Sequence, residues 1–329
     1  MENSYIKQFP DVMRGKKVLY VHGFGSSGQS GTVTLIRQSL PEATVIAPDL
    51  PIHPEEAMQL LAALCRQEEP DLIIGTSMGG MYAEMLRGYD RILVNPAFEM
   101  GETMRLHGMT GAQHFSNPRQ DGVQEFIVTK ALVKEYKNVT EQCFGSVTPE
   151  ECDRVWGLFG DEDTTVDTIG LFSRHYPRAI RFHGEHRMND RSFMHSVMPV
   201  IRWIDDRQEG HQRPIIYVAM SAMSDKWHKP FSSLQKTLRS LLERYELFFV
   251  DKASYRAEAY AATLEWLYEY VNVPAFGHTV FTNQKHLLYG DYLIDTEKTA
   301  GMATLIEYGS DTFKTWDDVS EYFDRLCGQ

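Results

Sequence analysis

Short apolar runs alternate with amphipathic stretches over residues 16–207, and this pattern predicts an α/β domain. Apolar positions recur at helical spacing in residues 32–40, 54–66, 78–87 and 190–206. The runs between them predict strands, which read "KKVLYVHG", "ATVIAPD", "DLIIGTS", "DRILVNPAF", "RVWGLFG" and "RAIRFHG". Short buried strands separated by helices indicate a parallel sheet with helices on both faces.

Residues 99–153 interrupt this alternation. They contain no run that predicts a core strand, and they are rich in Gly, Asn, Gln and Met. The segment lies between two predicted sheet strands, which is a typical position for a lid or excursion over a site.

A polar stretch at 205–214, "DDRQEGHQRP", predicts a linker between two domains. A second alternating series follows, with helices expected near 231–244, 255–270 and 316–326 and strands in "PIIYVAM", "YELFFVD", "HTVFT", "YLID" and "ATLIEYG". We therefore expect an α/β domain over residues 1–209 and a second, smaller, Rossmann-like α/β domain over 212–329.

Composition narrows the class of partner. The 329 residues carry a formal net charge of −12, with 43% hydrophobic and 24% charged residues, which disfavours nucleic acid and anionic membranes as main partners. No apolar run approaches the roughly 20 residues that span a bilayer, and the N-terminal residues lack a signal-peptide pattern. The four cysteines form no C-x-x-C pair, so we expect reduced thiols, a cytoplasmic location, and neither a metal nor a cofactor.

The glycine-rich stretch "VHGFGSSGQSGT" allows three interpretations. Gly23, Gly25 and Gly28 fit a dinucleotide-binding fingerprint, with Asp49 about twenty residues later. A Walker A loop is disfavoured because Gln29 stands where the phosphate-binding lysine should be. The third interpretation treats "HGFG" as an oxyanion loop of the kind found in esterases.

Ser77 lies in the motif Gly-Thr-Ser-Met-Gly, which fits G-x-S-x-G. A predicted strand precedes it and a predicted helix follows it, which is the context of a nucleophile elbow. The serine needs a base and an acid, in the order Ser, acid, His along the chain. Two later strand ends supply candidates: Asp161, Asp163 and Asp167 after residue 160, and His183 and His186 after residue 182.

His186 lies in a loop that leads to a helix, whereas His183 is nearer the strand end and suits a structural role. For the acid, Asp163 fits the hydrolase pattern G-x-x-D-x-x-V, and Asp161 directly follows Gly160. We prefer Asp163 and keep Asp161 as the alternative. The succession of Ser77, Asp163 and His186 on three loops disfavours the dinucleotide interpretation.

The motifs "LYVHGFGSS", "IIGTSMGGMYAEML", "LVNPAF", "GDEDTTV" and "GEHR" resemble those of the small α/β-hydrolase esterases of the YqiA type. The resemblance covers roughly residues 16–207. It implies Ser77 as nucleophile and His186 as base, and the family pattern would fit Asp161 as the acid because this residue directly follows Gly160. The backbone N–H groups of Phe24 and Met78 would then form the oxyanion hole.

Residues 214–329 resemble the bacterial 5′-deoxynucleotidases of the haloacid-dehalogenase-like phosphatases, through "YELFFV", "TNQKHLLYGDYLIDT" and "GSDTFKTWDDVSEYF". By this resemblance Lys285 would bind phosphate and Asp295 would bind metal. The nucleophilic Asp-x-Asp motif is replaced by Ala219 and Ser221, and Asp251 replaces a Ser or Thr. We therefore expect a pseudophosphatase domain in which the fold remains and the chemistry is lost.

The sequence as a whole favours a serine hydrolase that acts on a small ester or thioester through an acyl-enzyme. The alternative is a non-catalytic binding or scaffold protein whose second domain recognises a ligand or partner. Pairing of two chains through the second domain is a further expectation.

Overall fold

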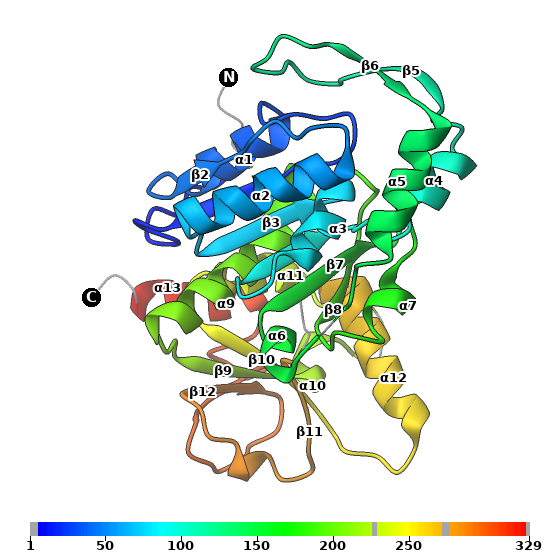
Figure 1. Ribbon diagram of the computed structural model, residues 1–329. Helices are drawn as coiled ribbons and strands as arrows, with labels where there is room; N and C mark the ends of the chain where they lie inside the picture. The colour runs from blue at the N-terminus through cyan, green and yellow to red at the C-terminus, as the bar shows by residue number, and fades with distance from the viewer. Residues whose placement is uncertain (1–5, 146, 226–228, 272–276, 327–329) are drawn as a thin grey trace. The chain divides into compact units, whose positions relative to one another are not determined.

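The computed structural model describes residues 6–145, 147–225, 229–271 and 277–326. The chain divides into two compact units, Met1–Asp205 and Asp206–Gln329, which we call the first and second unit (Figure 1). Cys65, Cys143 and Cys152 are free thiols, and Cys327 lies outside the described residues. Within these ranges no helix combines the length and apolar character needed to cross a membrane.

A six-stranded parallel sheet forms the centre of the first unit, in the order β2-β1-β3-β4-β7-β8. Its strands are β1 (Lys17–Val21), β2 (Thr44–Ile46), β3 (Leu72–Thr76), β4 (Arg91–Val94), β7 (Val155–Gly160) and β8 (Ala179–Phe182). The four strands from β1 through β7 in this order are almost wholly buried, as expected for a parallel sheet with both faces covered. The predicted parallel α/β fold is confirmed.

Helices connect these strands, and most of them match the predicted periodicity. They are α1 (Gly31–Ser39), α2 (Pro54–Glu68), α3 (Met78–Met85), α7 (Ile169–Phe172), α8 (Asp190–Ser192) and α9 (Met198–Glu209). The single helix expected over 190–206 contains a π-helical segment, Phe193–Val197, between α8 and α9.

The excursion of residues 99–153 contains α4 (Met100–Leu106), β5 (Gly111–His114), β6 (Glu125–Val128), α5 (Lys130–Thr140) and α6 (Pro149–Cys152). The strands β5 and β6 pair with each other as an antiparallel hairpin outside the central sheet. Helices α4 and α5 lie side by side beneath the hairpin (Figure 1).

The strand order places the chain's early loops next to Ser77. From β1 the chain passes to β2 on one side and later returns through β3 on the other side of β1. In open parallel sheets, sites form at such a switch point, outside the carboxyl ends of the strands. Here those ends carry Gly23 after β1 and Ser77 after β3.

The second unit contains a five-stranded parallel sheet in the order β11-β10-β9-β12-β13. The strands are β9 (Ile215–Ala219), β10 (Glu246–Asp251), β11 (Thr279–Phe281), β12 (Tyr292–Asp295) and β13 (Thr304–Glu307). Its helices include α10 (Met220–Met223), α11 (Leu234–Leu242), α12 (Ala257–Trp266), a π-helical segment (Leu267–Val271), a 3₁₀ turn (Lys285–Leu287) and α13 (Trp316–Leu326). The fully buried Trp316 joins α13 to this core and donates a hydrogen bond to the Ala222 carbonyl.

Candidate active site

Ser77 occupies a strained turn between β3 and α3. Its backbone angles are φ 55° and ψ −122°, a combination that non-glycine residues rarely adopt and that recurs at functional sites. The turn is tight enough that a Cβ on Gly79 would lie 2.0 Å from the Val21 carbonyl oxygen. Only glycine permits this approach of α3 to β1. The serine hydroxyl is thereby held at the N-terminus of a helix.

His186 connects Ser77 to Asp163. Its Nε2 lies 3.0 Å from the Ser77 Oγ, and its Nδ1 lies 2.7 Å from Asp163 Oδ2. The Asp163 side chain is 2% exposed and that of His186 is 20% exposed. The three side chains therefore form a continuous hydrogen-bonded chain, in which only the end at Ser77 and His186 reaches solvent.

Backbone groups fix the Asp163 carboxylate. Its Oδ1 accepts hydrogen bonds from the N–H groups of Thr165 (2.7 Å) and Val166 (3.0 Å). Burial by itself raises the pKa of this carboxyl, but the hydrogen bonds from His186, Val166 and Thr165 outweigh it and hold the pKa below its ordinary value. Asp163 is therefore an anion at neutral pH.

The alternative acid, Asp161, lies against the other histidine. Its Oδ2 is 2.7 Å from His183 Nδ1, and its Oδ1 accepts from the Gly184 N–H at 3.1 Å. This second pair links the ends of β7 and β8. The structure thus brings Asp163, and not Asp161, to His186.

The loop after β1 lies beside the serine. A Cβ on Gly23 would be 3.3 Å from the Ser77 Cβ, so the next residue, Phe24, is adjacent to the serine turn. The Met78 N–H belongs to the first turn of α3, whose N–H groups have no acceptor within the helix. These are the two backbone groups expected to bind an oxyanion.

His22 holds this loop in place. Its Nδ1 donates to the Gly23 carbonyl (2.8 Å), and its Nε2 accepts from the Leu50 N–H (3.1 Å). Burial lowers the pKa of the imidazole, and this effect outweighs the opposing influence of the Gly23 carbonyl and the Asp49 charge. The ring is therefore neutral, and both of its nitrogens are used.

Asp49 has a role that the sequence interpretation missed. Its carboxylate accepts from the Gly28 N–H (2.8 Å) and from the Gln120 N–H (2.6 Å). A Cβ on Gly28 would lie 2.1 Å from the Ala47 carbonyl oxygen, so this glycine allows the loop to approach β2. The features that resembled a dinucleotide fingerprint instead join the loop after β1 to the excursion.

Asn95 is a residue that the sequence analysis did not single out. It lies at the carboxyl end of β4 with φ 45°, and it is 1% exposed. Its amide donates to the carbonyls of Glu185 (3.0 Å) and His186 (3.1 Å) and accepts from the Gly160 N–H (2.7 Å). The signal was a polar residue at the end of a buried strand, in "LVNPAF". Asn95 ties together the loops that carry Asp163 and His186.

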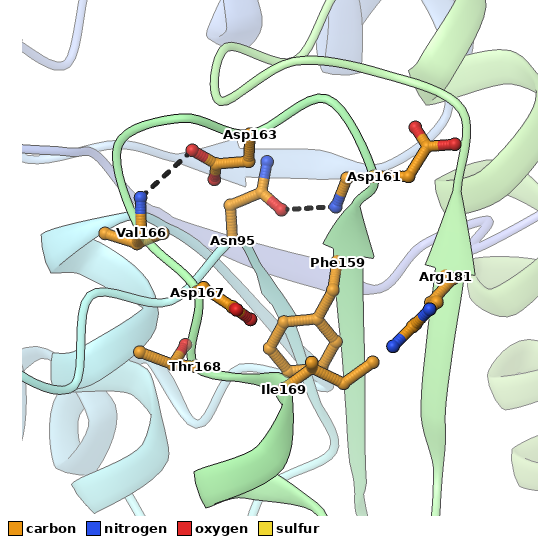
Figure 2. Close-up of a pocket in the computed structure, with 10 residues that line it drawn as sticks. Asn95, Phe159, Asp161, Asp163, Val166, Asp167, Thr168, Ile169 and Arg181 are labelled. Atoms are coloured by element: carbon orange, nitrogen blue, oxygen red, sulfur yellow. Dashed lines mark hydrogen bonds between the residues drawn. The ribbon is translucent and has the colours of Figure 1, made fainter.

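A cavity of about 260 Å³ lies next to these loops. Figure 2 shows Asp161, Asp163 and Asp167 around it, with Arg181 on β8 and Asn95 directly after β4. Asp167, the third acidic candidate, thus lines the cavity. Within the described part of the chain, no hydrogen bond joins Asp167 to His186, and the His186 Nδ1 contacts Asp163 instead.

The candidate residues of the second unit also gather at the carboxyl ends of strands. Ala219 ends β9, Asp251 ends β10 and Asp295 ends β12. The fully buried Asp295 accepts from Ser221 Oγ (2.9 Å) and forms an ion pair with Lys285 (2.6 Å).

Further charges surround this pair. Glu297 lies 3.3 Å from the Lys285 ammonium and 3.0 Å from that of Lys252. Asp251 accepts from the Thr263 hydroxyl at 2.6 Å. Ala219 contributes no polar side-chain atom to the cluster. Among the residues that the structure describes, no group of three or more His, Cys, Asp or Glu side chains is arranged to hold a metal ion.

Comparison with known proteins gives one family match. The model of an uncharacterised protein family, UPF0227, matches residues 17–201, which is more than half of the chain.

Several solved structures are also similar. A structure titled "Marine microorganism esterase" is 15% identical with a TM-score of 0.36, covering 59% of this chain and 94% of the other. Est1E from Butyrivibrio proteoclasticus is 15% identical with a TM-score of 0.39, covering 62% and 92%. The "Thioesterase Domain From Curacin Biosynthetic Pathway" is 16% identical with a TM-score of 0.35, covering 60% and 92%.

Proposed function

This chain belongs to the uncharacterised protein family UPF0227, and for it we propose the function of a serine hydrolase that cleaves a carboxylic ester or thioester. Ser77 is the nucleophile, His186 the base and Asp163 the acid. The observation that carries the proposal is the chain of two hydrogen bonds, 3.0 Å from Ser77 Oγ to His186 Nε2 and 2.7 Å from His186 Nδ1 to Asp163. This is the arrangement that activates a serine hydroxyl.

The acylation step follows from these contacts. The Ser77 Oγ attacks the carbonyl carbon and its proton passes to His186 Nε2. The anionic Asp163 stabilises the imidazolium and holds its orientation. The N–H groups of Phe24 and Met78 donate to the carbonyl oxygen as it gains negative charge. His186 then protonates the departing alkoxide or thiolate, which leaves the acyl group on Ser77.

Deacylation uses the same groups. His186 takes a proton from a water molecule, whose oxygen attacks the acyl carbon. When the tetrahedral intermediate collapses, Ser77 Oγ recovers a proton from His186 and the carboxylic acid is released. Each turnover consumes one ester or thioester and one water molecule.

The test is covalent labelling with a fluorophosphonate, followed by mass spectrometry of the peptide that contains Ser77. We expect one adduct on Ser77, and we expect Ser77→Ala to abolish both the adduct and the hydrolysis of p-nitrophenyl acetate. Thermal unfolding of the variant serves as the control for folding. An unlabelled wild-type protein would contradict the proposal and favour the scaffold alternative. Full labelling of Ser77→Ala would show that Ser77 is not the nucleophile.

For the second unit we propose a haloacid-dehalogenase-like fold without phosphatase activity. Phosphoryl transfer of that kind needs a carboxylate nucleophile and a divalent cation. Ala219 supplies no carboxylate, and the Asp295 charge is already neutralised by Lys285 at 2.6 Å. The Asp251 carboxylate would repel a phosphate, at a cost of roughly 4 kcal/mol for a separation of ~4 Å near a protein surface.

A further inference from the structure

We propose that the cavity beside the Asp163 loop is a binding site for a small zwitterion, and that a free amino acid with an apolar side chain is the class of ligand it takes. Its volume is about 260 Å³, which is just below the roughly 300–1,000 Å³ of sites for drug-sized ligands. Ser77 and His186 are not among the described residues that line it. The site is therefore separate from the reacting hydroxyl, and the proposal does not depend on the hydrolase function.

Two charged side chains in the lining define the chemistry of the site. Asp167 and Arg181 carry opposite charges. Figure 2 shows the Asp167 carboxylate and the Arg181 guanidinium on opposite sides of the Phe159 ring, each turned toward it. Both residues are exposed, and neither side chain has a hydrogen bond or ion pair with another residue in the described part of the chain. One anionic and one cationic group are thus accessible to a ligand that enters from solvent.

The other polar side chains of the lining are bound to protein groups. Asn95 and Asp163 use their polar atoms within the candidate active site. Asp161 Oδ2 lies 2.7 Å from His183 Nδ1, and the Thr168 hydroxyl donates to a backbone carbonyl at 2.6 Å. Recognition of a charged ligand is therefore left to the two side chains that have no such partner.

Apolar side chains separate the two charges. Phe159 is 6% exposed, and it pairs with Arg181 in the register of β7 and β8, so both side chains project from the same face of the sheet. Val166 and Ile169, which also line the cavity, are partly buried against the hydrophobic core. An apolar group of the ligand is removed from water against this surface, whereas a polar group there would lose its hydration without gaining a partner.

A ligand with both charges suits this lining better than a ligand with one. An ammonium group at Asp167 and a carboxylate at Arg181 each form charge-assisted hydrogen bonds, and a guanidinium binds a carboxylate through two parallel N–H donors. A ligand that carried only one charge would be repelled by the side chain of the same sign. A free amino acid carries the two charges beside its side chain, and an apolar side chain then packs on Phe159.

The experiment is isothermal titration calorimetry of the full-length protein with leucine, isocaproate and isopentylamine. Isocaproate lacks the ammonium group of leucine and isopentylamine lacks its carboxylate. We expect leucine to bind at least about ten-fold more tightly than either, because each analogue loses the hydrogen bonds to one charged group. Equal affinities would overturn the proposal. So would the absence of leucine binding at about 10 mM, a concentration that fills most of a site with millimolar affinity.

Variants of the two charged residues should give a crossed pattern. Asp167→Asn should weaken leucine binding at least about ten-fold and leave isocaproate binding unweakened. Arg181→Gln should weaken leucine binding to a similar extent and leave isopentylamine binding unweakened. Loss of folding would not produce this pattern, because it would remove all three ligands together. A folded Asp167→Asn or Arg181→Gln that binds leucine as the wild type does would overturn the assignment.

Two neighbouring residues provide matched controls. Glu162 and Arg174 are exposed and do not line the cavity. Glu162→Gln and Arg174→Gln remove the same charges as the two test variants, so they should leave the affinity for leucine unchanged. If they weaken leucine binding as much as Asp167→Asn and Arg181→Gln do, the net charge of the protein governs binding and the proposed site is wrong.

Ser77→Ala separates this inference from the proposed function. Because Ser77 is not part of the cavity lining, the variant should bind leucine as the wild type does. Leucine binding by a protein that fluorophosphonate does not label would support the zwitterion site and contradict the hydrolase proposal. A labelled protein that does not bind leucine would overturn the zwitterion site and leave the hydrolase proposal intact.

Discussion

Asp161 and Asp163 lie two residues apart on one loop, and each carboxylate binds a different histidine at the same distance, 2.7 Å. The distance to the imidazole therefore does not distinguish them. The difference lies in the second ring nitrogen, because His186 Nε2 is 3.0 Å from the Ser77 Oγ. One pair is connected to the serine and the other joins the ends of two strands.

Replacing each aspartate by asparagine separates these two pairs. Asp163→Asn should lower kcat by about 10³–10⁴-fold, because the amide neither stabilises the imidazolium nor holds the reactive tautomer. Asp161→Asn should lower it by less than about ten-fold. Steady-state hydrolysis of p-nitrophenyl acetate measures both. Equal losses in the two variants, or a larger loss in Asp161→Asn, would show that the acid is misassigned.

Asn95→Asp tests Asn95 as a positioning residue. The substitution keeps the side-chain shape and the acceptor for the Gly160 N–H, but it replaces the donor to the Glu185 and His186 carbonyls with an oxygen. Misplacement of His186 should lower kcat by about 10–100-fold, with a much smaller effect on KM. The rate of fluorophosphonate labelling should fall in parallel.

Asn189→Asp is the matched control for this variant. Asn189 caps α8 and its side-chain oxygen accepts from the Ser192 N–H, a role that aspartate also performs. It should therefore leave kcat unchanged. If Asn95→Asp alters only the thermal unfolding midpoint while its folded fraction labels at the wild-type rate, Asn95 contributes to stability and not to positioning.

The neutral state of His22 predicts a specific dependence of stability on pH. Burial lowers the pKa of the folded imidazole below 6.5, so at a pH between the folded and unfolded pKa values the unfolded chain binds more protons. The stability that His22 contributes is complete above about pH 6.5 and is lost as the pH falls from there through the folded pKa. The difference in unfolding free energy between wild type and His22→Asn should therefore shrink from pH 8 to pH 5. Urea denaturation measures this difference, and a constant or growing difference would contradict a neutral His22.

The second unit should have no phosphatase activity. With Mg²⁺ and a panel of nucleoside monophosphates, the full-length protein should release no phosphate above the buffer background, because Ala219 provides no nucleophile. Asp295→Asn and Lys285→Met should leave this result unchanged. Phosphate release by the wild type that disappears in Asp295→Asn would instead establish an active phosphatase site.

The sequence predicted the elements that depend on local pattern. The strand that ends at Thr76 and the helix that begins at Met78 follow from an apolar run and a G-x-S-x-G turn, and the α/β fold follows from their alternation. The C-terminal helix Trp316–Leu326 has the predicted bounds. The candidate catalytic residues Ser77, Asp163 and His186 could be predicted because each one lies in a loop that follows a predicted strand.

Contacts between residues that are far apart in the sequence could not be predicted from this local pattern. The choice between Asp161 and Asp163 depends on how two loops turn after β7 and β8, and both residues fit a local motif. Asn95 acts through carbonyls about ninety residues away, and Asp49 binds an N–H seventy-one positions later. The pairing of β5 with β6 likewise depends on contacts within an excursion whose composition suggested no strand.

The bridge that Asp49 forms between Gly28 and Gln120 has a consequence for protein engineering. A chimaera that receives the β5–β6 hairpin of a relative, but keeps its own loop after β1, would lose partners on both sides of the junction. Residues 23–28, 49 and 115–120 should therefore be transplanted together. In the evolution of the family, insertions near residue 120 should be accompanied by compensating changes in the loop that begins at Gly23, so the hairpin and this loop should vary together.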